Sequence, residues 1–214
     1  WRTAAQLAFD MDAIGGQINA YTTRDSTCFY ARVLDSHLGQ AAAILCDMFF
    51  ESLFAEADVE SERSVVLEEI DMYDDAPDDI VVERLLGRCF PGSLGRPILG
   101  TEKTLAALNG EALRAFKARH YTPDRIVVAL CGSIDPAVIR QLSERFSALP
   151  SGSAPEVEQG VYTPAVYFKK KATEQNHICL GFRGAPATEP ARFSDHLMAS
   201  ILGGGMSSRL SIRP

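Results

Sequence analysis

The chain has 214 residues, of which 46% are hydrophobic and 23% are charged, and its formal net charge is −7. This composition predicts a globular protein with enough apolar side chains for a full core. The acidic balance and the lack of a basic stripe argue against nucleic acid as a partner. No apolar run in the sequence is long enough to predict a membrane-spanning helix, so we expect no membrane association.

The first predicted helix begins after Thr3, because Gln6 follows three residues later and the pair forms a capping-box pattern. Gly15 and Gly16 predict where this helix ends. Ser36 is expected to cap a second helix. The apolar stripe of that second helix consists of Leu38, Ala41, Ala42, Leu45, Met48 and Phe49.

Two strands are predicted between these helices, at residues 17–22 and 27–34. The short polar segment between them, residues 23–26, is typical of a turn. The two strands are therefore expected to form a β-hairpin.

Residues 58–73 are predicted to form one amphipathic helix. Its apolar stripe consists of Val59, Val66, Ile70 and Tyr73. Glu62 and Glu69 flank this stripe instead of lying opposite it, and their spacing places them on one face, roughly 10 Å apart along the axis. A carboxylate beside a buried stripe needs a partner, which could be an arginine, a capped backbone or a metal ion.

The acidic run at residues 74–79 is interpreted as the N-terminus of a further helix, at residues 80–90, and not as a calcium loop. Acidic residues favour helix N-termini, and the EF-hand spacing with its glycine is absent. A structured loop is expected at residues 91–100. Two more helices are predicted at residues 101–108 and 110–120, the second capped by Asn109.

The remaining sequence predicts strands at residues 125–133, 161–170 and 176–182, since each segment is rich in apolar residues. Asp135 and Pro136 predict the start of a helix that ends near Phe146. A last helix is expected to start near Thr188. Its residues predicted to face inward are Phe193, Leu197, Ile201 and Leu202.

Irregularly alternating strands and helices, together with the hairpin, favour an α+β fold whose antiparallel sheet is flanked by helices. Residues 151–161 have the composition of a linker. We therefore predict one domain at residues 1–150, followed by a second, incomplete unit at residues 162–214.

The sequence contains no complete set of metal-binding or nucleophilic residues. None of the four histidines forms an HExxH or HxxEH motif, and neither a GxSxG motif nor a CxxC pair is present. The five separate cysteines lie in apolar stretches, which predicts reduced, buried thiols in a cytosol-like compartment. The residues of this chain by themselves could therefore form at most half of a metal-binding site.

Five stretches, in this order, resemble the M16 zinc metallopeptidases, the group of pitrilysin, insulinase and mitochondrial processing peptidase. The similarity is greatest to bacterial processing-protease-like members. The matching stretches are RTAAQLAFDMDAIGGQINAYTTRDSTCFYARV, ESERSVVLEEIDMYDDAPDD, LGRPILGTEKTL, HYTPDRIVVALCGSID and LGGGMSSRL.

The resemblance implies a zinc site made by an HxxEH motif and a glutamate on another helix. The matching positions make Glu69 the metal ligand and Glu62 a supporting acid required for catalysis. Counting back from Glu69 puts HxxEH just before Trp1, so the other zinc ligands and the general base are expected upstream of this chain. The chain alone is accordingly expected to be inactive and to bind zinc weakly.

In this family a peptide substrate adds to an edge strand, and the matching positions here are Asn19 and Ala20. The resemblance implies a zinc-dependent metalloendopeptidase with two similar α+β halves around a chamber, residues 162–214 beginning the second half. Expected partners are peptide substrates and a second half or subunit, in a homo- or heterodimer. The expected location is the bacterial cytoplasm, or a compartment like the mitochondrial matrix. The alternative is a non-catalytic subunit that binds substrate or supports an active one.

Overall fold

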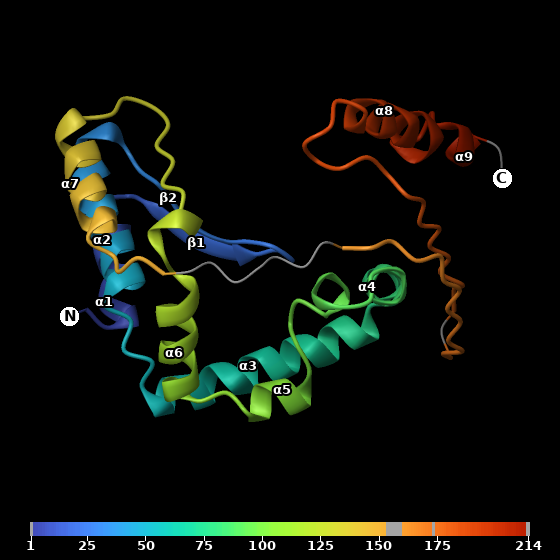
Figure 1. The fold of residues 1–214 in the computed structure, drawn as a ribbon, viewed down its shortest axis with the longest axis horizontal. Coiled ribbons are helices and arrows are strands. Elements are labelled where there is room, and N and C mark those ends of the chain that lie inside the picture. The colour runs from blue at the N-terminus through green and yellow to red at the C-terminus, as the bar shows by residue number, and fades with distance from the viewer. Residues whose placement is uncertain (1, 153–159, 173, 213–214) are drawn as a thin grey trace.

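The computed structural model describes residues 2–152, 160–172 and 174–212 (Figure 1). The fold is α+β, with helices around one antiparallel hairpin. The strands are β1 (Gln17–Thr22) and β2 (Thr27–Arg32). The helices are α1 (Ala4–Ala13), α2 (Leu38–Phe50), α3 (Glu56–Asp75), α4 (Pro77–Cys89), α5 (Glu102–Ala106), α6 (Gly110–His120), α7 (Pro136–Ser147), α8 (Arg192–Gly203) and α9 (Arg209–Ile212). Three short 3₁₀ turns are η1 (Asp35–His37), η2 (Ser93–Gly95) and η3 (Pro123–Arg125).

Helix α2 lies at the centre of the core and contributes to both of its buried clusters. One cluster joins α2 to α7 and consists of Ala42, Cys46, Val138 and Leu142. The other joins α2 to α1 and the hairpin and consists of Met11, Ala41 and Ile44, with Ile18 of β1 packed against it. The hairpin is therefore fixed at its open end by the core, and it extends away from α2 toward α3 and α4 (Figure 1).

Most of the predicted caps are confirmed. The side chains of Thr3, Asn109 and Asp135 each accept a hydrogen bond from the first turn of a helix. The cap predicted at Ser36 is wrong, because the Ser36 N–H donates to the side chain of Asp35 (2.8 Å) within η1. The residue that immediately precedes α2 is His37, and it makes no side-chain cap.

The hairpin is confirmed, although β2 ends two residues before the predicted boundary. The strands predicted at residues 125–133, 161–170 and 176–182 are wrong, since none of these segments pairs with a strand in the described part of the chain. Apolar content indicates that a segment is suited to burial, but a strand also needs a neighbour for its backbone. Val127 is accordingly 91% exposed and Val166 is 98% exposed.

The C-terminal helix α8 does not bury the residues predicted to face inward. Phe193 and Leu197 are each 64% exposed, and Ile201 and Leu202 are also exposed. The helix begins at Arg192, later than predicted, and it ends at the expected glycines. The thiol prediction was also wrong in part, because Cys46 and Cys89 are buried whereas Cys131 is exposed.

The predicted linker spans residues 151–161, and residues 153–159 of it lie outside the described residues. The segment after the linker contacts the C-terminal end of α4. Its Thr163 N–H donates to the carbonyl of Cys89 (2.7 Å), and the ring of Tyr162 contacts Phe90. Among the described helices, none has both the length and the apolar character needed to cross a lipid bilayer.

Candidate metal-binding and peptide-binding site

Helix α3 has the apolar stripe that its sequence predicts. The half-buried residues of this stripe are Val59, Val66, Ile70 and Tyr73. Glu62 and Glu69 are exposed and lie along the flank of the stripe. Tyr73 follows Glu69 by one helical turn, so these two side chains extend from the same face of α3.

The carboxylates of Glu62 and Glu69 have no cationic partner among the residues that the structure describes. The nearest arginine in sequence, Arg63, instead forms an ion pair with Glu60. Both carboxylates are therefore open to solvent and keep their oxygen atoms available as ligands.

Arg63 fixes α3 against the short helix α5. Its Nε donates to the carbonyl of Leu105 (3.2 Å), and its Nη2 donates to the carbonyl of Leu108 (2.6 Å). The guanidinium group is charged and planar, so it can serve two carbonyl groups at once. These contacts set the position of the helix that carries Glu62 and Glu69.

The described residues could supply part of the ligand set of a zinc site but not all of it. Carboxylate oxygen is an ordinary zinc ligand, and catalytic zinc sites use three protein ligands. No group of three or more His, Cys, Asp or Glu side chains that could hold a metal ion occurs in the described ranges. Glu69 and Glu62 can therefore contribute to a site that other residues would have to complete.

Strand β1 has a free edge in the described part of the molecule. The Thr23 N–H donates to the Ser26 carbonyl (2.7 Å), which fixes the alternation of hydrogen bonds along the hairpin. By this alternation, the backbone groups of Ile18, Ala20 and Thr22 are directed away from β2. An extended peptide could therefore pair with this edge through N–H and C=O groups at every second residue.

Asn19 and Ala20 lie in the middle of this edge. The Oδ1 atom of Asn19 accepts a hydrogen bond from the backbone N–H of Ala20 (2.8 Å). The outward N–H of Ala20 is thus satisfied by the neighbouring side chain. A peptide that adds to β1 must replace this contact with one of its own carbonyl groups.

The hairpin turn is directed toward the end where α3 meets α4 (Figure 1). The pKa of Tyr73 is raised mainly by burial and further by the charges of Asp79 and Glu83, and the nearby charge of Arg24 partly opposes this increase. Arg24 belongs to the turn between β1 and β2. The free strand and the helix that carries the two carboxylates are linked indirectly, because Arg24 binds the loop after α4 and α4 packs against α3.

The interpretation of residues 23–26 as a simple polar turn overlooked Arg24. Its Nη1 atom donates to the carbonyls of Leu94 (2.8 Å) and Arg96 (2.7 Å), in the loop that follows α4. The only sequence signal was a long cationic side chain within a turn of otherwise short residues. A small cavity of about 170 Å³ lies between this turn and the loop.

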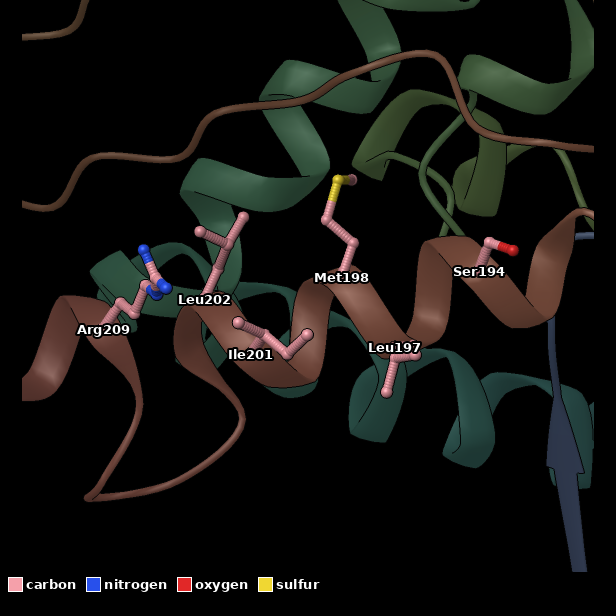
Figure 2. Close-up of a pocket in the computed structure, with 6 residues that line it drawn as sticks. All are labelled: Ser194, Leu197, Met198, Ile201, Leu202 and Arg209. Carbon is pink, nitrogen blue, oxygen red and sulfur yellow. The ribbon is translucent and has the colours of Figure 1, made fainter.

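A second cavity lies along α8, with a volume of about 330 Å³ (Figure 2). Its lining residues are Ser194, Leu197, Met198, Ile201, Leu202 and Arg209. It contains no acid, histidine or cysteine among these residues, so it offers no group for proton transfer or metal binding. The chemistry of the candidate site therefore remains with α3 and the hairpin.

Two family models match this chain. Residues 2–102 match "Insulinase (Peptidase family M16)", and residues 107–213 match "Peptidase M16 inactive domain". The first match covers β1 and α3, and the second covers α7 and α8. Together they support the resemblance that was identified from the sequence motifs.

Curated relatives are similar over nearly all of this chain. The "Uncharacterized zinc protease YmxG" of Bacillus subtilis is 44% identical over 212 residues, which cover 98% of this chain and 52% of the relative. The "Uncharacterized zinc protease SCO5738" of Streptomyces coelicolor is 40% identical over 220 residues, which cover 98% of this chain and 48% of the relative. The chain thus spans about half the length of these relatives.

Solved structures support the fold. The peptidase M16 inactive domain from Pseudomonas fluorescens aligns with a TM-score of 0.80 at 17% identity, covering 98% of this chain and 53% of that one. A putative M16-like peptidase from Alicyclobacillus acidocaldarius aligns with a TM-score of 0.60 at 24% identity, covering 76% of this chain and 38% of that one.

Proposed function

The chain belongs to the M16 family of peptidases, and we propose that it supplies one zinc ligand and the peptide-binding strand of a zinc-dependent endopeptidase. One observation carries this proposal. Among the residues that the structure describes, β1 keeps a free edge, and Glu62 and Glu69 lie on one face of α3 without a cationic partner. An edge for a peptide beside ligands for a metal ion is the arrangement that peptide hydrolysis needs.

Substrate binding would begin with strand addition to β1. The outward N–H and C=O groups of Ile18, Ala20 and Thr22 would pair with the peptide backbone, which makes binding largely independent of peptide sequence. A carbonyl group of the peptide would replace Asn19 Oδ1 at the Ala20 N–H. The released Asn19 carboxamide could then donate to a second group of the same peptide.

Glu69 would coordinate zinc through its carboxylate, and Glu62 would hold the surrounding ligands in position from about two turns earlier on α3. Bound zinc polarises a scissile carbonyl and lowers the pKa of a coordinated water. The carboxylate of Glu69 is already free of arginine, so it needs no rearrangement of an ion pair to act as a ligand. The further ligands and the general base would come from residues outside the described chain.

The test replaces Glu69 with Gln in the complete protein and measures bound zinc by mass spectrometry and peptide cleavage. Glu69→Gln should lose most of the bound zinc and all measurable cleavage. Glu68→Gln is the matched control, because it makes the same change on the solvent side of α3 and should retain both. The isolated 214-residue chain should show no tight zinc binding by calorimetry.

If zinc content is unchanged in Glu69→Gln, then Glu69 is not a ligand and the endopeptidase proposal fails. A complete protein with neither zinc nor cleavage, which still binds peptides along β1, would instead fit the alternative of a substrate-holding partner subunit.

We further propose that the exposed apolar side chains after residue 160 pack against a second half or a second subunit. Phe168 is 86% exposed and Ile178 is 83% exposed, which are high values for such large apolar side chains. Backbone amides at 161–172 and 174–182 should therefore exchange hydrogen slowly in the complete protein. Exchange at the rate of a free peptide would contradict this packing.

A further inference from the structure

We propose that Arg24 is a positioning residue that fixes β1 relative to α3, so that a peptide bound to β1 lies at the correct place beside Glu69. This inference rests on the proposed peptidase function. Arg24 lies in the hairpin turn, at the end of β1 that the core does not hold. Its two hydrogen bonds to the loop after α4 link positions about 70 residues apart in sequence.

The two acceptor carbonyls belong to a loop that is itself tightly fixed. Gly95 packs so closely on the end of α4 that a Cβ atom there would collide with the carbonyl oxygen of Phe90, and it would lie 3.2 Å from the Cα of Gly87. Gly92 has a φ of 102°, which few other residues adopt. The loop therefore has one path across α4, and the carbonyls of Leu94 and Arg96 are already in place for Arg24.

The same turn is linked to α3 through α4, because the loop that Arg24 binds packs against α4. Figure 1 shows the hairpin above α3, with its turn directed toward the end where α3 meets α4. Helices α3 and α4 pack against each other, so a loop fixed on α4 also has a fixed position relative to Glu69.

This arrangement separates peptide binding from peptide positioning. The edge groups of β1 would still pair with a peptide if the turn moved, because these groups belong to the strand itself. The scissile bond, however, would be displaced from Glu69, and displacements of about 1 Å can reduce rates by about a hundredfold. Loss of Arg24 should therefore lower kcat much more than it raises KM.

The test compares Arg24→Ala with Arg32→Ala in the complete protein. Arg32 is the matched control, because it is an exposed arginine at the other end of the same hairpin. Arg24→Ala should lower kcat at least tenfold, change KM less than threefold and retain the wild-type zinc content. Arg24→Lys should recover part of the rate, since a lysine can still donate to the loop carbonyls, and Arg32→Ala should behave as wild type.

A measurement that does not depend on enzymatic activity separates this inference from the proposed function. Amide hydrogen exchange at residues 21–28 should become several-fold faster in Arg24→Ala, whereas exchange near Gln17 at the core end should not change. If the wild-type protein cleaves no peptide, the proposed function fails and the exchange result still decides whether Arg24 holds the turn. Unchanged exchange, an unchanged kcat, or an equal loss in Arg32→Ala would overturn the inference.

Discussion

The position of α3 should depend on Arg63, and the variant Arg63→Met tests this directly. Methionine keeps an apolar stem of similar length and a high helix propensity, but it has no donor for the carbonyls of Leu105 and Leu108. The substitution therefore removes both hydrogen bonds without leaving a large gap. Any loss of stability reports on the guanidinium group and not on the packing of the stem.

The expected loss follows from the contacts. A hydrogen bond from a charged donor contributes about 1.5–3 kcal/mol when it is well buried. The Arg63 side chain is 19% exposed, so water can partly replace the lost donors, and about 1–1.5 kcal/mol for each bond is more appropriate. The ion pair with Glu60 adds about 0.3 kcal/mol. Arg63→Met should therefore destabilise the protein by about 2–3 kcal/mol.

The assay is urea unfolding followed by circular dichroism at a helix-sensitive wavelength. The control is Arg84→Met, because Arg84 pairs with Asp74 at 3.4 Å on the surface and should contribute less than about 1 kcal/mol. The dependence of the unfolding free energy on urea must be equal in all three proteins for the comparison to hold. A loss below about 0.5 kcal/mol in Arg63→Met, or an equal loss in Arg84→Met, would refute this account of how α3 is held.

Two further predictions concern the core and the thiols. A Cβ atom added at Gly16 would lie 2.7 Å from Cγ1 of Val33, so Gly16→Ala should cost about 1–3 kcal/mol in the same unfolding assay, whereas Gly203→Ala, with open space around it, should be neutral. Cys131 should react with a thiol reagent in the folded protein, and Cys46 should react only after unfolding, because burial both shields the Cys46 thiol and raises its pKa. Comparable reaction rates for the two folded-state thiols would contradict the structure.

The sequence predicted those features that depend on neighbouring residues. The Thr3 cap needs only Gln6 three positions away, and the stripe of α3 needs only helical spacing, so both appear as expected. The hairpin is also local, because a short turn connects its strands. The strand predicted at residues 125–133 failed because pairing requires a second strand, and apolar composition does not say where that strand is.

The candidate site was predictable only in part for the same reason. Glu62 and Glu69 share a face because of their spacing, which any reader of the sequence can count. The hydrogen bonds of Arg24 to a loop about 70 residues away depend on how separate elements pack. No local pattern distinguishes an arginine that holds such a loop from one that is solvated in a turn.

The charges on α3 give a physical reason to expect a metal ion, and not an arginine side chain, as the partner of Glu62 and Glu69. Two carboxylates roughly 10 Å apart repel each other in water by only about 0.4 kcal/mol, so the helix can carry both without compensation. Arg63 follows Glu62 in sequence, yet its guanidinium is held by carbonyls of the α5 region and by Glu60. Glu62 and Glu69 thus keep carboxylates without an ion-pair partner among the described residues, and such carboxylates can accept a divalent metal ion.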